Sequence, residues 1–327
     1  MKRKRYFPFL LCGSVFFIVG ILTYLIGVLL SIPRYLLNLH FFLEIQEFLV
    51  WYSGIPIVIS LIFACIDFFL LFNNRRLGNQ LRETPLKKRT VTVVLTAYND
   101  EESIAEVVSD FKSHPNVDRV IVVSNNSNDK TLERAKNAGA ITFNEEKIGY
   151  GQCVYRCLTE ALKFEDAELI VLCEGDLTFR SFDIEKLLAY IPHADIAIGT
   201  RTSERLRQYS TQLSTFMLYG NIFVAKILEV KHFGRCTLTD VGTTFKLCRR
   251  ESLKKLLPLV NPNINLEFNA HFMDFAIDNN IILVECPITF HPRVGVSKGG
   301  NINNWRGFIV GLMMLNGIIF GWKKRYD

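Results

Sequence analysis

The sequence contains no two cysteines separated by two residues and no group of cysteine and histidine at zinc-ligand spacing, although it has eight cysteines and six histidines. This absence excludes a zinc-finger type of site and a C-x-x-C redox pair. The scattered cysteines are typical of free thiols in a cytosolic protein. Cys153 and Cys157 are four residues apart and can share a helix face, but two ligands do not close a metal site. We expect them to be small buried residues.

The sequence also lacks a stripe of basic residues interleaved with aromatic ones, so nucleic acid is not an expected partner. Basic residues outnumber acidic ones by 38 to 32, giving a net charge of +6. Much of this excess lies in clusters beside apolar segments, at residues 2–5, 75–76, 87–89 and 323–325. Such clusters favour contact with anionic lipid. The sequence therefore predicts a lipid bilayer as a partner.

Two long runs almost without charge predict membrane-spanning helices, at residues 8–30 and 54–72. Runs of about 20 apolar residues cross a hydrocarbon core of about 30 Å. The first run is too long for a signal peptide's apolar region and has no evident cleavage site. Asp67 lies in the second run, either as a functional carboxylate or near enough to the helix end to reach the interface.

Charge around these runs predicts their orientation. Basic residues precede the first run and follow the second, whereas the connection at 31–53 holds only Arg34 against Glu44 and Glu47. By the positive-inside rule, the segment before the first run and the segment after the second are both cytosolic. We therefore expect an integral membrane protein, in the plasma membrane of a prokaryote, with a cytosolic catalytic domain.

A third apolar run, at residues 307–322, has basic residues at both ends and is short for a span. An interfacial or re-entrant helix is expected there. The predicted organisation is a transmembrane hairpin with a basic linker (1–85), a soluble domain (86–300) and a membrane-associated C-terminal helix (301–327).

From residue 91 onward, short β-branched runs alternate with helical stretches, which predicts an α/β domain with a mostly parallel sheet and flanking helices. The expected strands are 91–96, 119–123, 141–143, 169–173 and 196–199, and the expected helices lie near 101–113, 129–138, 150–163 and 182–190. Ligands bind such sheets just beyond the carboxyl ends of the strands.

Three polar segments follow these strands. After the first, Asn99 and Glu102 have the spacing of a helix-capping box. After the second, residues 124–129 are turn formers. After the fourth, an apolar strand runs directly into Glu174-Gly175-Asp176. Alternate residues of a strand point to the same side, so the two carboxylates can share Mg²⁺ or Mn²⁺ with a diphosphate. An isolated pair of this kind more often belongs to a surface loop.

The order of these motifs resembles the inverting family 2 glycosyltransferases with the GT-A fold, and among them the polyprenyl-phosphate sugar transferases. The resemblance covers roughly residues 91–298. The matching segments are 96–99 with Glu102, Asn125 after the second strand, 149–151, 174–176, 199–201, 239–245, and Arg293 with Gly295, Ser297 and Lys298. Two departures stand out: Ser124-Asn125-Asn126 replaces the family's usual Asp-Asp-Gly, and Glu174 replaces the first Asp of D-x-D.

The resemblance implies a role for each matching residue. Glu174 and Asp176 would hold Mg²⁺ or Mn²⁺, and Asp176, Asp240 and Arg201 would form the catalytic group. The nucleotide-sugar donor, a UDP- or GDP-sugar, would be bound by Thr96, Tyr98, Glu102, Asn125, Gly149, Gly151, Arg293 and Lys298. Guanidinium groups match phosphate oxygens in pairs, which favours Arg201 and Arg293 as phosphate ligands.

The expected reaction is inverting transfer of a sugar to a polyprenyl phosphate of the undecaprenyl or dolichyl type. A phosphate monoester is largely dianionic at neutral pH and needs no strong base. A hydroxyl acceptor would need one, and Asp240 and Glu267 are candidates, with helix capping and surface exposure as alternative roles.

Three points stay open at this stage. A transferase that acts on a glycolipid or polysaccharide hydroxyl is disfavoured by the lack of a Q-x-x-R-W motif; the nearest tryptophan segment is Asn303-Asn304-Trp305-Arg306. A non-catalytic nucleotide-binding scaffold is the other alternative. The sequence leaves a homo-oligomer open.

Overall fold

The computed structural model describes residues 7–37, 41–72, 82–295 and 303–323. These residues fall into two compact units, an N-terminal hairpin together with residues 229–235, and an α/β unit with the rest. Lys298 and the basic residues at 2–5 and 75–76 lie outside the described residues.

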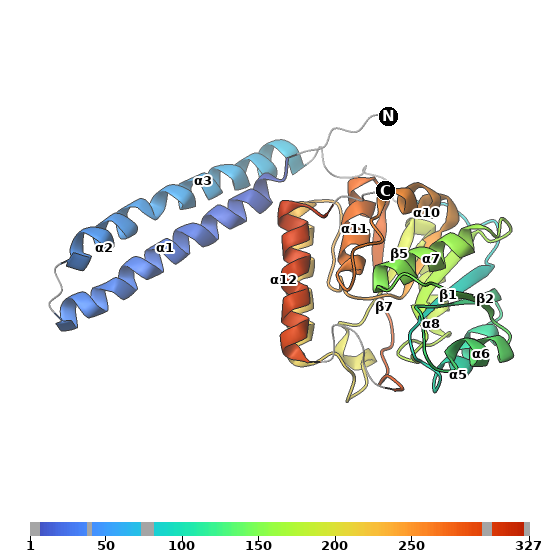
Figure 1. Cartoon of the computed structure of the whole chain (residues 1–327). Helices are drawn as coiled ribbons and strands as arrows, with labels where there is room; N and C mark the ends of the chain where they lie inside the picture. Colours follow the sequence, from blue (N-terminus) through green and yellow to red (C-terminus); the bar gives the residue numbers. More distant parts are fainter. Residues whose placement is uncertain (1–6, 38–40, 73–81, 296–302, 324–327) are drawn as a thin grey trace. The chain divides into compact units, whose positions relative to one another are not determined.

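The N-terminal hairpin consists of two antiparallel helical arms (Figure 1). α1 (Phe9–Leu37) is one arm, and the other comprises α2 (Phe41–Tyr52), α3 (Gly54–Cys65) and the π-helical segment η1 (Ile66–Leu71). Both predicted spans lie within these arms, and each arm has a helix of 29 residues that is long and apolar enough to cross a membrane. The predicted connection at 31–53 is mostly helical, because its apolar residues continue both helices.

Small residues and one carboxylate hold the two arms together. A Cβ atom on Gly20 would lie 2.6 Å from Ile57 Cγ1 and 3.0 Å from the Ser53 carbonyl oxygen, so this close approach needs glycine. The Leu10 amide, in the first turn of α1, donates to Asp67 Oδ2 at 2.6 Å. First-turn amides lack partners within their own helix, and an anion there is favourable. Buried Asp67 therefore has a structural role in the hairpin.

The α/β unit is built on a sheet in the order β3-β2-β1-β4-β6-β5-β7. The strands are β1 (Val91–Ala97), β2 (Val117–Ser124), β3 (Ile141–Asn144), β4 (Leu169–Glu174), β5 (Ile196–Thr200), β6 (Lys246–Arg249) and β7 (Leu283–Pro287). β6 runs antiparallel to both of its neighbours, and the other pairs are parallel. The five predicted strands are confirmed, whereas β6 and β7 were not predicted.

Helices cover both faces of this sheet. Val93 and Leu95 of β1 pack into a core with α5 (Ile104–Lys112), α6 (Thr131–Asn137) and α8 (Asp183–Tyr190). Val94 packs on the opposite side with α7 (Tyr150–Leu162), α10 (Arg250–Leu256) and α11 (Phe268–Asp278). Period-two alternation along β1 thus divides its side chains between two cores. Short 3₁₀ turns complete the unit at η2 (Ile191–His193), η3 (Glu204–Leu206) and η4 (Leu257–Leu259).

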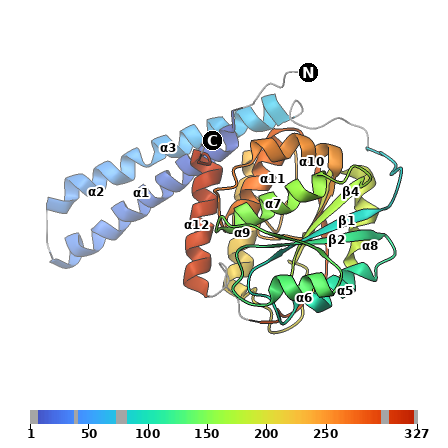
Figure 2. The ribbon, with the colours of Figure 1, turned by 45° about the vertical axis from the view of Figure 1, so that its right-hand side comes forward.

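Two further helices, α9 (Thr215–Lys231) and α12 (Asn304–Phe320), lie beside one another at one end of the α/β unit (Figure 2). Leu228 of α9 and Ile318 of α12 belong to the same core as α7. Their other faces are apolar and exposed, as at Tyr219 (66%), Phe223 (54%) and Trp305 (70%). Exposed apolar surface of this extent is typical of an interaction with a membrane or another apolar partner.

Candidate active site

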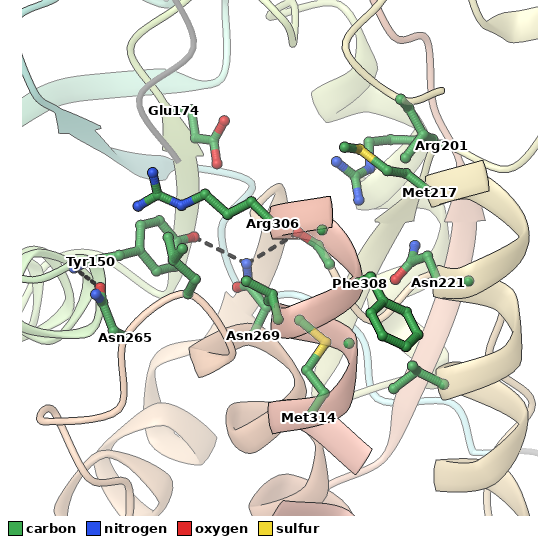
Figure 3. Close-up of a pocket in the computed structure, with 18 of the residues that line it drawn as sticks. Tyr150, Glu174, Arg201, Met217, Asn221, Asn265, Asn269, Arg306, Phe308 and Met314 are labelled. Atoms are coloured by element: carbon green, nitrogen blue, oxygen red, sulfur yellow. Dashed lines mark hydrogen bonds between the residues drawn. The ribbon is translucent and has the colours of Figure 1, made fainter. Parts of the chain in front are cut away.

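A cavity of about 960 Å³ opens at the carboxyl ends of β1, β2 and β4 and continues between α9 and α12. Its polar end is lined by Asp100, Asn125, Glu174, Arg201 and Arg293. Its other end is lined mainly by apolar side chains: Leu213, Phe216, Met217, Phe223, Val224, Phe308, Val310, Leu312, Met314 and Leu315. Figure 3 shows Glu174 and Arg201 facing this cavity, with Phe308 and Met314 below them. One cavity therefore offers both a charged and an apolar surface.

Glu174 ends β4 and lines the polar end of the cavity. Its Oε1 accepts a hydrogen bond of 2.6 Å from the Thr244 hydroxyl, which is itself 2.6 Å from the Tyr150 hydroxyl. The Asn269 amide donates to the Tyr150 oxygen at 3.1 Å. Burial and the nearby Asp176 carboxylate raise the pKa of Glu174 to about 7. The side chain is thus fixed in place by a buried polar network.

Asp176, two residues further, is 1% exposed and lies beneath the cavity lining. Its Oδ1 accepts hydrogen bonds from the Thr178 amide (3.1 Å) and hydroxyl (2.5 Å). Its Oδ2 is buried without a hydrogen bond and lies 3.2 Å from Arg293 Nη1. Arg293 therefore forms an ion pair with the second carboxylate of the predicted metal-binding motif.

Arg293 also reaches Asp100, whose Oδ1 is 3.0 Å from Arg293 Nη2. Asp100 is 7% exposed and lines the cavity, and its other carboxylate oxygen accepts from the Tyr98 amide at 2.9 Å. Burial raises the pKa of Asp100 despite the neighbouring guanidinium. Asp100 was not predicted as a site residue, although it directly follows the matching segment 96–99; only its pairing with Arg293, 193 residues away, distinguishes it.

Arg201 and Asp240 form a second ion pair at the polar end. The Arg201 Nε and Nη2 atoms are each 2.8 Å from an Asp240 oxygen, and the Arg201 backbone amide donates at 3.0 Å. The Asn221 amide and the Gly242 backbone also donate to Asp240. Burial alone would raise the pKa of Asp240, but the Arg201 guanidinium holds it below its ordinary value. The three hydrogen bonds to Asp240 fix the orientation of the Arg201 side chain.

Asn125 holds the segment that leads to α7. Its amide nitrogen donates to the Lys147 carbonyl at 2.8 Å, and its Oδ1 accepts from the Gly149 amide at 2.9 Å. Both Asn125 and Gly149 line the cavity, whereas Gly151 does not. A Cβ atom on Gly151 would lie 1.9 Å from the Ile264 carbonyl oxygen, so this glycine permits close packing.

The segment after β1 differs from its prediction in two respects. Thr96 and Tyr98 line the cavity, but Glu102 is exposed and is not among the lining residues. The predicted capping box does not form, because α5 begins only at Ile104. Asn99 instead adopts a left-handed backbone conformation, and its Oδ1 accepts from the Asn128 amide at 2.8 Å. This contact joins the loops after β1 and β2.

Three other residues named from the sequence have different positions. Glu267 precedes α11 and does not line the cavity. Cys153 and Cys157 are buried in α7, as expected of small core residues, and Cys153 also lines the cavity. Arg306, in contrast, lines the cavity from the first turn of α12. From the sequence, Arg306 was expected only to flank an apolar run.

The carboxylates at the polar end offer oxygen ligands of the kind that divalent cations bind. Asp100, Glu174 and Asp176 all act on the pKa of Arg293, which is raised in their field although burial opposes it. Asp100 and Asp176 are in direct contact with this guanidinium, and hard cations prefer carboxylate oxygens. Within the described ranges no three Asp, Glu, His or Cys side chains converge tightly enough to enclose an ion by themselves. Further oxygens from a ligand or water would be needed.

Comparison with known proteins identifies the family. The profile described as Glycosyl transferase family 2 matches residues 92–257. The chain belongs to glycosyl transferase family 2. An uncharacterized glycosyltransferase of Mycobacterium tuberculosis is 33% identical over 224 residues, which cover 68% of this chain and 94% of that relative.

Two other proteins extend the comparison. A dolichyl-phosphate hexose transferase of Haloferax volcanii is 25% identical over 209 residues, covering 64% of this chain and 86% of that protein. The solved structure of M. tuberculosis glucosyl-3-phosphoglycerate synthase, in complex with Mn²⁺, UDP and glucosyl-3-phosphoglycerate, has a TM-score of 0.52 at 16% identity. It aligns with 72% of this chain and 82% of its own. This likeness establishes the GT-A type of fold predicted from the sequence.

Proposed function

We propose that this family 2 glycosyltransferase transfers a sugar, with inversion, from a UDP- or GDP-sugar to a polyprenyl phosphate at the cytosolic face of a membrane. The observation that supports this most directly is the continuity of the cavity, which joins a carboxylate and arginine end to an apolar groove between α9 and α12. An acceptor with an anionic head and a long apolar chain matches both parts. The Haloferax relative, named as a dolichyl-phosphate hexose transferase, is consistent with it.

The donor is expected at the carboxyl ends of β1, β2 and β4, where Thr96, Tyr98, Asn125 and Gly149 line the cavity. Asn125 acts here by shaping the loop at 145–149, because both ends of its amide are bonded to that loop. Glu102 lies away from the lining, so its proposed contribution is through the loop rather than through contact. The synthase of M. tuberculosis that shares the fold binds UDP in its solved complex.

Glu174 and Asp176 are proposed to hold Mg²⁺ or Mn²⁺ together with the donor diphosphate. A divalent cation there would neutralise charge on the departing diphosphate. Thr244 orients Glu174, and Arg293, which lines the cavity, holds Asp176 and would be available to the donor phosphates. Arg201, fixed by Asp240, presents a second guanidinium to the cavity. Asp240 is therefore proposed as a positioning residue.

The acceptor phosphate would attack the anomeric carbon as the bond from that carbon to the diphosphate oxygen breaks. Attack from the opposite face inverts the anomeric configuration. A phosphate monoester with a second pKa of about 6 is already a dianion at neutral pH, so no protein base is required. The site has to position the acceptor phosphate and the donor diphosphate, which carry like charge, and its arginines can do so.

The exposed apolar faces of α9 and α12 are proposed to lie against the bilayer, with the hairpin as a membrane anchor and both chain ends cytosolic. Helices of this kind bury an apolar face at the interface between headgroups and acyl chains. This placement would let the lipid enter the groove from the membrane.

Membranes that contain the protein should be incubated with labelled UDP- or GDP-sugars, undecaprenyl phosphate and Mg²⁺ or Mn²⁺. We expect label in the organic phase with at least one donor. Asp176→Asn should abolish this product, whereas the exposed surface change Asp166→Asn should not. Full activity of Asp176→Asn would refute the metal assignment, and label only in glycolipids or polymers would show a hydroxyl acceptor instead.

A further inference from the structure

Arg306 differs from the other two arginines of the cavity in having no carboxylate partner among the described residues. Arg201 is paired with Asp240, and Arg293 is shared by Asp100 and Asp176. Both of those guanidinium groups are thus partly neutralised by the protein. Arg306 keeps its whole charge and its hydrogen-bond donors for a ligand.

The side chain of Arg306 extends from α12 into the cavity in the direction of Glu174 (Figure 3). It begins in the first turn of α12, where the Asn303 side chain accepts from the Arg306 amide at 2.8 Å. This capping contact fixes the backbone from which the guanidinium extends.

The first turn of α12 is also attached to α9. The Ser214 hydroxyl, just before α9, donates to Asn304 Oδ1 at 2.7 Å. A Cβ atom on Gly307 would lie 3.1 Å from Met217 Cε, so the two helices are nearly in contact beside Arg306. The position of Arg306 relative to the cavity is therefore set by the packing of α9 against α12.

Beyond Arg306 the lining provided by α12 becomes apolar, through Phe308, Leu312 and Leu315. Phe223 and Val224 of α9 face the same groove. Arg306 consequently stands at the junction between the apolar groove and the carboxylate end of the cavity. A ligand that fills both parts has to pass this guanidinium.

We propose that Arg306 binds the phosphate of the lipid acceptor and makes the site select a lipid phosphate over the corresponding lipid alcohol. This inference rests on the proposed function. A guanidinium can donate two parallel hydrogen bonds to phosphate oxygens, and charge-assisted bonds are the stronger class. A neutral hydroxyl in the same place carries no charge and cannot form such a pair with the Arg306 guanidinium.

The test compares Arg306→Gln and Arg306→Lys with the unaltered protein, using undecaprenyl phosphate as acceptor and the active labelled donor. Loss of the guanidinium should raise the KM for undecaprenyl phosphate by at least about tenfold and leave the donor KM within about twofold. The KM of Arg306→Lys for undecaprenyl phosphate should lie between those of the unaltered protein and Arg306→Gln, since lysine keeps the charge but loses the paired geometry. Lys254→Gln, which removes an exposed cation on α10, is the matched control and should change neither constant.

A binding measurement separates this inference from the proposed function. Purified protein should retain labelled undecaprenyl phosphate at least about tenfold more tightly than undecaprenol, and Arg306→Gln should remove that preference. A preference that survives in Arg306→Gln, or a rise in donor KM alone, would overturn the assignment. Binding that depends on Arg306 without any transferred sugar would instead uphold the assignment and refute the reaction.

Discussion

The Thr244 hydroxyl donates a 2.6 Å hydrogen bond to Glu174 Oε1. The acceptor is the first carboxylate of the proposed metal motif, and the donor lies in the loop before β6, 70 residues away. The Tyr150 hydroxyl and the Asn269 amide extend the contact into the protein. The Thr244 hydrogen bond therefore fixes the orientation of Glu174.

Replacing Thr244 with valine should disturb metal binding without removing a ligand. Loss of a hydrogen bond to a metal-binding side chain commonly costs about 10- to 100-fold in metal affinity or activity. We expect Thr244→Val to raise the Mn²⁺ concentration for half-maximal transfer by about tenfold or more. Thr159→Val, which removes a hydroxyl bonded only within α7, is the control. Equal Mn²⁺ dependence in both variants would contradict the role given to Thr244.

Replacing Arg293 should affect stability as well as activity. Arg293→Gln leaves Asp100 and Asp176 buried without their cation, and breaking one side of a buried pair costs about 3–5 kcal/mol. A fall in Tm is expected, and Asp100→Asn combined with Arg293→Gln should restore part of it. Arg180→Gln, in a more exposed pair with Asp110, should cause a smaller loss. An unchanged Tm in Arg293→Gln would mean that Arg293 serves the ligand alone.

Replacing Gly151 with alanine should disrupt packing of the α7 amino end. The added Cβ would meet the Ile264 and Pro262 carbonyl oxygens at 1.9 and 2.8 Å, so one of the two segments has to move. We expect less folded protein and a lower Tm. Gly220→Ala, in α9, meets nothing within 4 Å and should stabilise its helix by up to about 1 kcal/mol. A Tm for Gly151→Ala equal to that of the unaltered protein would contradict this geometry.

Stability should depend on pH through Lys246. This side chain is buried, donates to Asn269 Oδ1 at 2.8 Å, and burial lowers its pKa to about 7, against 10.5 when unperturbed. Between these values the unfolded chain binds a proton that the folded chain does not, so the folded state gains stability as pH rises. Below pH 7 both states hold the proton and the slope vanishes.

The measurement is Tm at several pH values between 7 and 9 for the unaltered protein and for Lys246→Met. As pH rises, the free energy of unfolding of the unaltered protein should increase relative to that of Lys246→Met by up to about 1.4 kcal/mol per pH unit. Buried thiols such as Cys157, whose pKa is raised by burial, act in the opposite direction but equally in both proteins. A difference that stays constant with pH would show that Lys246 remains charged.

The sequence was sufficient to predict the first five strands and the edge on which Glu174 and Asp176 lie. Each of these strands coincides with a short apolar or β-branched run in the sequence. β6 escaped prediction because Lys246 and Arg249 occupy a short strand without an apolar run. Their side-chain donors are satisfied by distant groups, such as Asn269 and the Ala194 carbonyl, that no local pattern reveals.

The sequence supplied candidate site residues that directly follow strand ends, but it could not show the tertiary contacts among them. Asp100 and Arg293 meet across 193 residues, and Arg306 reaches the cavity only because α12 packs beside α9. The capping box failed because Asn99 takes a backbone conformation that joins two loops instead of beginning a helix. Local spacing could not distinguish these outcomes.

The placement of α12 has a consequence for engineering. The profile of the family ends at residue 257, and the sheet is completed by β7, yet one wall of the cavity is contributed by residues 306–315. A chimera that joined the sheet and catalytic loops of this protein to the C-terminal helix of another member would inherit donor chemistry from one parent and acceptor selection from the other. Donor and acceptor preference should therefore be exchangeable as separate modules, with the crossover placed between β7 and α12.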